Sequence, residues 1–195
     1  MSNPAFSDFR KLLANDRTVR RFINDKPIGR DTLTELVDLT RLCASGRNAQ
    51  PLRYRLVCNP DECAGIYPLL KWAGYYTDWD GPEAPERPVA YMVQCLDTTL
   101  GNDVLCDDGL QLQAITLGAR TLGIGCCIIK AFNAPALAEA LGIPDRYKPR
   151  YVLALGYPAE EPIIVDMPSD GDFRYFRRED GCHCVPKRPL SDLII

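Results

Sequence analysis

The segment from Asp103 to Leu122 constrains the fold most, because it predicts a helix with apolar residues on nearly every side. A helix that packs on one face shows a single apolar stripe. Here the apolar positions are too many for one stripe: Val104, Leu105, Leu110, Leu112, Ala114, Ile115, Leu117, Ala119 and Leu122. We therefore expect a core helix buried nearly all round, ended by Gly123-Ile124-Gly125 and followed by an apolar strand at 126–129.

Helices and strands are predicted on both sides of this core helix. Helical spacing and capping residues predict helices at 4–14, from Pro27 to Ser45-Gly46, at 61–70 and from Asn133 to Gly142. Apolar runs predict strands at 53–58, 89–96 and 151–155. Beyond Ala159 the chain is polar and irregular until its apolar end, which we expect a partner subunit to cover. We expect residues 1–195 to form one domain.

Composition narrows the class of protein. The chain has a formal net charge of -3 and a pI near 5.3, its apolar runs are too short to span a membrane, and its first residues show no secretion signal. We expect a cytoplasmic protein without a membrane or nucleic-acid partner. The nine cysteines are then expected to be free thiols. Cys58, Cys63 and Cys182-His183-Cys184 do not match the usual spacing of a zinc site, so no metal site is predicted.

The stretch Asp16 to Phe22 is the strongest candidate for binding. It carries Arg17, Thr18, Arg20 and Arg21 in an acidic protein. An arginine side chain can donate two parallel hydrogen bonds to a phosphate or carboxylate and stays charged at working pH. The alternative is a solvated basic turn after the first helix.

No classical set of catalytic side chains is predicted. His183 is the only histidine and lies in the polar tail, while Asp107 and Asp108 are adjacent and therefore lie on different faces of a helix. This composition suits a protein in which a bound cofactor supplies the reactivity. The long loop at 72–88 carries Tyr75, Tyr76 and Trp79, which either wall a substrate pocket or pack within the protein.

Five motifs together resemble those of the flavin-dependent nitroreductase family. The first two are Arg17-Thr18-Val19-Arg20-Arg21-Phe22, similar to RRSxRxF, and Cys43 to Pro51, similar to PSxxNxQP. The other three are Leu122-Gly123-Ile124-Gly125, Leu155-Gly156-Tyr157-Pro158 and Lys187-Arg188-Pro189-Leu190. They occur in the family's order along nearly the whole chain.

The resemblance implies an FMN-binding homodimer with an α+β fold, in which helices flank a central mixed sheet and the C-terminal segments are exchanged between subunits. It places Arg17, Thr18, Lys187 and Arg188 at the FMN phosphate and Arg20 at the N1/O2 edge of the flavin. The partner subunit would contribute the segment that contains Ala44, Ser45, Gly46 and Asn48. Backbone at Ile129 and Lys130 would approach the N5/O4 edge.

The function that the resemblance implies is hydride transfer from NADH or NADPH through flavin N5 to a small acceptor, such as a nitroaromatic or a quinone. Three positions depart from the family pattern: Asp16 replaces an arginine, Ala44 a proline and Lys130 a small residue. Asp16 and Lys130 motivate a second hypothesis, a flavin-binding or storage protein without reductase activity. A cysteine-based metal or redox-sensing module is the third hypothesis.

Overall fold

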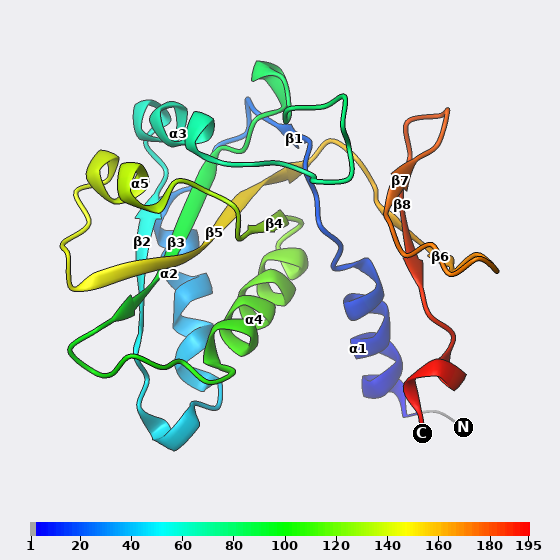
Figure 1. The fold of residues 1–195 in the computed structure, drawn as a ribbon, viewed down its shortest axis with the longest axis horizontal. Coiled ribbons are helices and arrows are strands. Elements are labelled where there is room, and N and C mark those ends of the chain that lie inside the picture. Colours follow the sequence, from blue (N-terminus) through cyan, green and yellow to red (C-terminus); the bar gives the residue numbers. More distant parts are fainter. Residues whose placement is uncertain (1–2) are drawn as a thin grey trace.

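The computed structural model describes residues 3–195. Its centre is a five-stranded sheet, which can be followed in Figure 1. The strands run in the order β1-β5-β3-β2, with β4 also paired to β5. Their bounds are β1 Phe22–Ile23, β2 Leu52–Val57, β3 Ala90–Asp97, β4 Gly125–Ile129 and β5 Tyr147–Pro158. All four strand pairs in this sheet are antiparallel.

The prediction of a mixed central sheet is therefore wrong for the strands that the structure describes. The parallel pairing that the fold does contain is local. It consists of an isolated bridge between Thr18 and Cys126 and a strand pair in a separate small sheet near the C-terminus. A connection that contains a helix can return the chain in either direction, so the alternation of helices and strands does not decide how strands pair.

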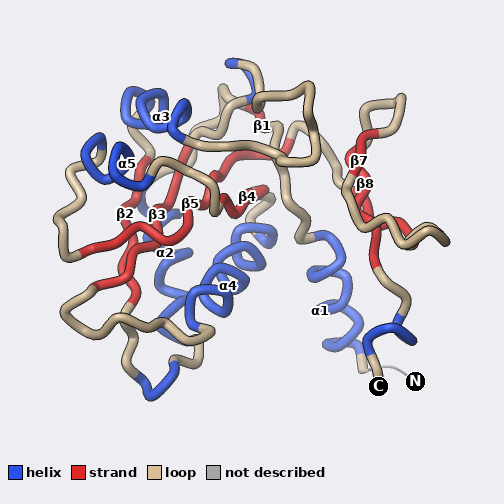
Figure 2. Tube along the Cα trace, viewed as in Figure 1, coloured by secondary structure: helices blue, strands red, loops and turns tan. Residues whose placement is uncertain are grey.

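Helices cover both faces of the sheet (Figure 2). They are α1 Pro4–Asn15, α2 Arg30–Asp38, α3 Pro60–Ile66, α4 Asp107–Thr121 and α5 Ala134–Ala140, with short 3-10 helices at Leu39–Leu42, Gly46–Asn48, Tyr67–Leu69, Ala84–Glu86 and Leu190–Leu193. They confirm the predicted helices, most of them within a few residues. The side chain of Asn133 accepts a hydrogen bond from the amide of Ala136, as expected of a helix cap.

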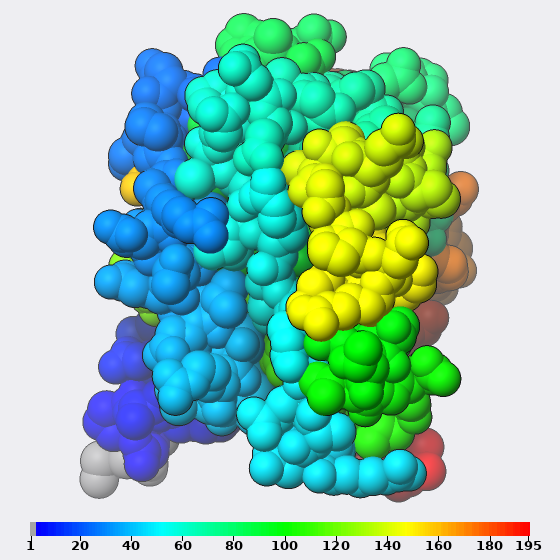
Figure 3. Space-filling model, turned by 90° about the vertical axis from the view of Figure 1, so that its left-hand side faces the viewer, coloured from blue at the N-terminus to red at the C-terminus, as the bar shows by residue number. Residues whose placement is uncertain are grey.

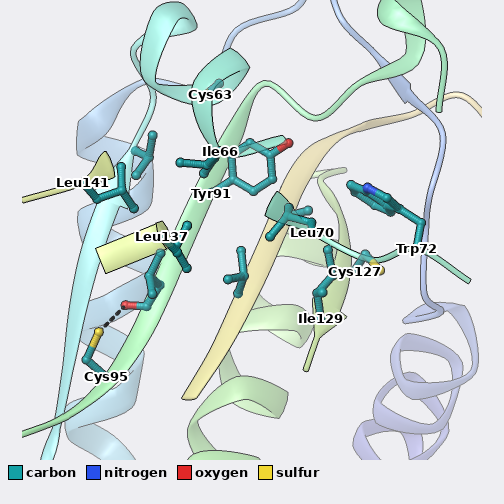
Figure 4. Close-up of a cluster of buried hydrophobic side chains, with 14 residues drawn as sticks. Cys63, Ile66, Leu70, Trp72, Tyr91, Cys95, Cys127, Ile129, Leu137 and Leu141 are labelled. Atoms are coloured by element: carbon teal, nitrogen blue, oxygen red, sulfur yellow. Dashed lines mark hydrogen bonds between the residues drawn. The ribbon is translucent and has the colours of Figure 1, made fainter. Parts of the chain in front are cut away.

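The sheet is buried on both faces, and each face has its own hydrophobic core. Alternate residues of β3 point to opposite sides, so Tyr91 joins the cluster under α3 and α5 while Met92 joins the one against α2 and α4. Figure 4 shows the first cluster, with Cys63 and Ile66 of α3 close to Tyr91. All eight residues of β3 are buried.

One long side of the sheet ends at β2, which is an edge strand. Figure 3 shows it as a cyan column between the blue region of α2 and the yellow region of α5 and β5. Charged side chains on an edge strand oppose unwanted pairing with another chain. Arg53 and Arg55 provide such charges here, and Arg55 is paired with Glu62.

The core helix, α4, is buried on one side rather than all round. Leu112, Ile115 and Ala119 are buried against the sheet, whereas Leu110 is 44% exposed. Leu122, just after the helix, is 49% exposed. The predicted burial on nearly all sides is therefore wrong for the single chain. Some apolar positions at and beyond the ends of α4 are therefore exposed in the single chain.

The tail beyond Ala159 is more ordered than its polar composition predicts. It forms a second sheet in the order β6-β8-β7, from Ile163–Asp166, His183–Lys187 and Phe176–Arg177. Figure 1 shows this sheet beside α1, at one side of the molecule. The buried side chains of Cys184 and His183 anchor it, because burial of a few residues outweighs the polarity of their neighbours.

Two facing glycines determine where the arginine stretch lies. Gly125 of β4 is paired with Gly156 of β5. A Cβ atom at Gly125 would lie 2.8 Å from Val19, and one at Gly156 would lie 2.8 Å from Phe22. The glycines therefore let the backbone of residues 19–22 pack directly onto the sheet, which fixes Arg17, Thr18 and Arg20 on either side of Val19.

Substitution of Gly156 tests this packing. Gly156→Ala should lower the free energy of unfolding by about 1–3 kcal/mol, because the new methyl group overpacks against the buried Phe22. Gly65→Ala is the matched control in helix α3, since a Cβ atom at Gly65 would meet no described atom within 4 Å. The control should raise stability by about 0.5–1 kcal/mol in urea titrations. Equal effects of the two substitutions would contradict the packing argument.

Candidate functional site

A hollow between α1, α4 and β4 contains the start of the arginine stretch. Its volume is about 190 Å³, and its lining residues are Asp16, Arg17, Thr18, Gln113, Thr116, Cys126 and Ile128. Asp16 ends α1 and accepts hydrogen bonds through Oδ2 from Gln113 Nε2 and Thr116 Oγ1, both at 2.7 Å. The carboxylate is therefore held by the side of α4.

Arg17 lies in this hollow without an acidic partner among residues 3–195. One of its Nη atoms donates to the carbonyl of Leu13 at 2.8 Å, while its Nε–H is buried and has no acceptor. A buried donor that lacks an acceptor costs free energy, and an anion would satisfy it. Thr18 lies next to it, and its backbone bridges to Cys126 of β4. Arg17 and Thr18 thus form one wall that can bind an anion.

Arg20 points into a different environment, a cluster with Arg20 and His183 buried at its centre and the other members partly buried. We call it the histidine cluster: Arg20, Tyr76, Glu160, Tyr175, Arg177 and His183. The guanidinium of Arg20 contacts His183 Nε2 at 3.0 Å and lies 4.6 Å from the centre of the Tyr175 ring. Its backbone amide donates to Glu160 at 2.7 Å. Glu160 in turn is 3.4 Å from Arg177.

Hydrogen bonds define the charge state of His183. Because a guanidinium can only donate, Nε2 must accept and Nδ1 carries the hydrogen, which lies toward the hydroxyl of Tyr76. His183 is 2% exposed. Burial first, and then the charges of Arg20 and Arg177, lower the pKa of His183 to about 4. The imidazole is therefore neutral at physiological pH.

The histidine cluster also holds the aromatic loop at 72–88. Tyr76 contacts His183, and Arg177 lies over the rings of Tyr76 and Trp79 at 5.3 and 5.6 Å. Tyr75 packs against Tyr175 with ring centres 4.9 Å apart. These contacts support the packing interpretation of the three aromatic residues, and they tie the loop to the C-terminal sheet.

The segment that contains Ala44, Ser45, Gly46 and Asn48 lies at the start of α4. Asp107 is 1% exposed and accepts hydrogen bonds from the hydroxyl of Ser45 at 2.6 Å and the amide of Gly46 at 2.8 Å. Arg47, Asn48 and Gln50 all have φ near +50°. Left-handed backbone is uncommon outside glycine and collects at functional sites. The segment is therefore a strained loop held by one buried carboxylate.

The remaining predicted site residues lie in two further places. Ile129 ends β4 and is buried, whereas Lys130 donates to the carbonyl of Arg150 at 3.3 Å and lies over the ring of Tyr151. Lys187 and Arg188 are exposed at the end of β8. Within the described chain, no hydrogen bond or ion pair joins either of them to the wall of Arg17 and Thr18.

Sequence reasoning missed two parts of this site. Gln113 and Thr116 line the hollow from α4, and their spacing of three residues on an otherwise apolar helix is the signal that could have indicated them. The partners of Arg20 were also missed. His183 and Tyr175 come from a tail whose composition predicted no structure, so only the fold reveals their contact.

The cysteines form no metal centre in the part of the chain that the structure describes. All nine are free thiols, and no three His, Cys, Asp or Glu side chains among residues 3–195 come together as ligands. His183 uses both ring nitrogens on Arg20 and Tyr76. The hypothesis of a metal module from Cys182-His183-Cys184 therefore gains no support.

No described helix is both long and apolar enough to cross a membrane.

Comparisons with known proteins point to one family. Residues 103–157 match the model of the Nitroreductase family. The "Putative NADH dehydrogenase/NAD(P)H nitroreductase" of Archaeoglobus fulgidus is 28% identical over 159 residues, which cover 77% of this chain and 86% of that protein.

Solved structures show the same fold. The nitroreductase family protein of Streptococcus pneumoniae superposes with a TM-score of 0.69 at 18% identity, covering 96% of this chain and 98% of that one. An FMN-dependent nitroreductase of Clostridium difficile superposes with a TM-score of 0.64 at 19% identity, covering 86% of this chain and 97% of its own.

The chain is similar to the nitroreductase family, a family of oxidoreductases, in its family model, its curated relatives and its solved neighbours, as its motifs predicted. The α+β architecture with helices around an antiparallel sheet is shared with the solved relatives. The residues that match the family model include helix α4, strand β4 with Gly125, and the part of β5 that contains Gly156.

The buried His183 predicts a specific dependence of stability on pH. The folded pKa of about 4 lies below the ordinary value of 6.5, so its contribution is complete above pH 6.5 and is lost as pH falls toward 4. Between pH 7.5 and 5 the loss should be about 2 kcal/mol. Because the chain has one histidine, the difference between the wild type and His183→Gln in urea titrations isolates this effect. Parallel pH profiles for the two proteins would contradict it.

Proposed function

We propose that the protein is an FMN-dependent oxidoreductase that transfers hydride from NADH or NADPH to a small acceptor such as a nitroaromatic or a quinone. The bound flavin would supply the redox chemistry by taking up hydride and passing it on. Similarity to the nitroreductase family supports the proposal, as does the fold shared with an FMN-dependent nitroreductase. The observation that carries it is the guanidinium of Arg17 beside Thr18, which has a buried Nε–H without an acceptor and no acidic partner among residues 3–195.

The residues around the hollow fit the phosphate of FMN. Arg17 offers a charged donor without an acid partner in the described chain, and Thr18 lies beside it on the same wall. The hollow of about 190 Å³ is smaller than the ~300 Å³ at which pockets for small molecules usually begin. One chain therefore offers room for a phosphate-sized group, and the ring system requires additional surface.

A homodimer supplies that surface in our proposal. The strained segment at 44–48 and the basic pair Lys187 and Arg188 lie apart from Arg17 in the single chain, and a second subunit can bring its copies to the same site. Helix α1 supports this arrangement because none of its residues is buried. Phe6 and Phe9 are 62% and 51% exposed, and Ile194 near the C-terminus is 67% exposed. Such apolar faces usually mark an interface.

Asp16 favours the alternative of a flavin-binding protein without reductase activity. Its carboxylate lines the same hollow as Arg17, where it opposes an incoming phosphate. Hydrogen bonds from Gln113 and Thr116 hold its Oδ2 atom against α4, which reduces this opposition. Anaerobic mixing with NADH or NADPH distinguishes the two functions, because a reductase bleaches the flavin absorbance on a catalytic timescale and a storage protein does not.

Arg17→Ala tests the phosphate site. The substitution should weaken FMN binding by about 1.5–3 kcal/mol, the range of a charge-assisted hydrogen bond. Arg10→Ala removes an exposed arginine from helix α1, just before Arg17 in the chain, and is the control, for which we expect unchanged affinity. Flavin fluorescence on titration of the apoprotein measures both. If Arg17→Ala binds FMN as tightly as the wild type, the phosphate lies elsewhere.

Phe9→Glu tests the proposed dimer. Burial of an aromatic side chain at an interface commonly contributes about 2 kcal/mol or more. A homodimer contains two copies of Phe9, so the loss should be about 4 kcal/mol and the dissociation constant should rise about 1,000-fold. Lys11→Glu changes a side chain that is already charged and exposed, on another side of the same helix, and should leave association nearly unchanged. Sedimentation over a range of concentrations gives the result. A wild-type protein that stays monomeric would refute the proposed dimer and would leave the proposal for the phosphate site unaffected.

A further inference from the structure

A cavity distant from the proposed flavin site lies between α3 and the chain segments at 24–27 and 84–91. Its volume is about 360 Å³, within the range of pockets that bind small molecules. Its buried lining residues include Cys63 of α3 and Tyr91 of β3, which are 7% and 1% exposed, and Figure 4 shows them on facing sides of the core cluster. It has no lining residue in common with the hollow around Arg17.

The walls of this cavity suit a compact apolar molecule. They are formed mainly by proline, alanine and valine side chains: Pro27, Pro60, Ala64, Ala84, Pro88 and Val89. Such side chains are small or rigid, so little conformational entropy is lost when a ligand packs on them. Burial of an apolar body against them is therefore favourable.

Arg87 places a positive charge in this apolar wall. Its guanidinium stacks on the ring of Tyr67 at 4.0 Å, and its Nε–H is buried without an acceptor. Among residues 3–195, no carboxylate lies within ion-pair distance of it. The neighbouring Glu86 is paired with Arg21 at 2.6 Å, and Glu62 on α3 is paired with Arg55.

We propose that this cavity is a binding site for a small organic acid with a compact apolar body, whose carboxylate pairs with Arg87. The stacked guanidinium is already oriented, and a carboxylate would fill the unmet hydrogen bond of Nε. The apolar body would lie on Ala64 and Val89, above Cys63. This site is independent of the flavin, so its test does not depend on the proposed function.

Cys58 provides a local measure of occupancy. Cys58 lines the cavity and is partly exposed. Cys63 also lines it, but its thiol is unreactive. Burial, and then the neighbouring Cys58 and Glu62, raise the pKa of Cys63 to about 12. The probe is cyclohexanecarboxylate, and cyclohexanecarboxamide is its neutral match. The rate of alkylation of each thiol is followed by mass spectrometry of the full-length protein after digestion.

Cyclohexanecarboxylate at about ten times its dissociation constant should slow the alkylation of Cys58 about tenfold. The exposed Cys106 outside the cavity should react at an unchanged rate. The amide should protect Cys58 far less. Arg87→Gln should weaken protection by the acid about 10- to 100-fold, the range expected for a lost charge-assisted hydrogen bond, while Arg30→Gln, at an exposed arginine outside the cavity, should not.

Three results would overturn the proposal: no protection of Cys58 at any soluble concentration of the acid, equal protection by acid and amide, or full protection in Arg87→Gln. Ala64→Phe gives a second test if Arg87→Gln does not fold. Ala64 is exposed on α3 and lines the cavity. A phenylalanine there should occupy the space and abolish protection while Arg87 remains. Protection that survives this substitution would place the acid elsewhere.

Discussion

The close contact between residues 19–22 and the paired strands β4 and β5 is the constraint on which the rest of the structure depends. Gly125 and Gly156 leave no side chain between the sheet and this segment, so Val19 and Phe22 fill the space. With these two side chains buried, Arg17 and Arg20 are held at defined positions next to the core. A flexible segment would lose more entropy when it binds an anion.

Arg20 shows how the protein stabilises a buried charge without a direct ion pair in the described chain. The guanidinium of Arg20 contacts the neutral imidazole of His183 and the face of the Tyr175 ring. The carboxylate of Glu160 accepts a hydrogen bond from the backbone amide of Arg20. Charge-assisted hydrogen bonds and aromatic faces together offset part of the desolvation cost. The same contacts join the arginine stretch, the aromatic loop and the C-terminal sheet, so three segments distant in sequence depend on one another.

Local patterns predicted the elements well, and contacts between distant segments poorly. The spacing of Leu33 and Leu36 and the cap at Asn133 depend on nearby residues, and the structure confirms the helices that they predicted. The antiparallel direction of the strands and the order in the tail depend on long-range pairing, which a local pattern does not contain.

The candidate site divides in the same way: its motifs indicated Arg17 and Thr18, which line one hollow. The contact of Arg20 with His183 spans 163 positions, and no short motif records it. The roles of Ser45, Lys130 and Lys187 at a cofactor remain predictions, because they depend on how two copies of the chain meet.

The carboxylate of Asp16 next to Arg17 has a consequence for how a charged molecule approaches the protein. The two opposite charges nearly cancel beyond about 10 Å, the distance over which salt screens charges at about 0.1 M, and the whole chain carries a net charge of -3. An anion is therefore not attracted from afar and meets the guanidinium only at close range. Encounter with the hollow is governed by diffusion and shape, and added salt should not slow it, because salt screens the repulsion between the anion and the negative net charge.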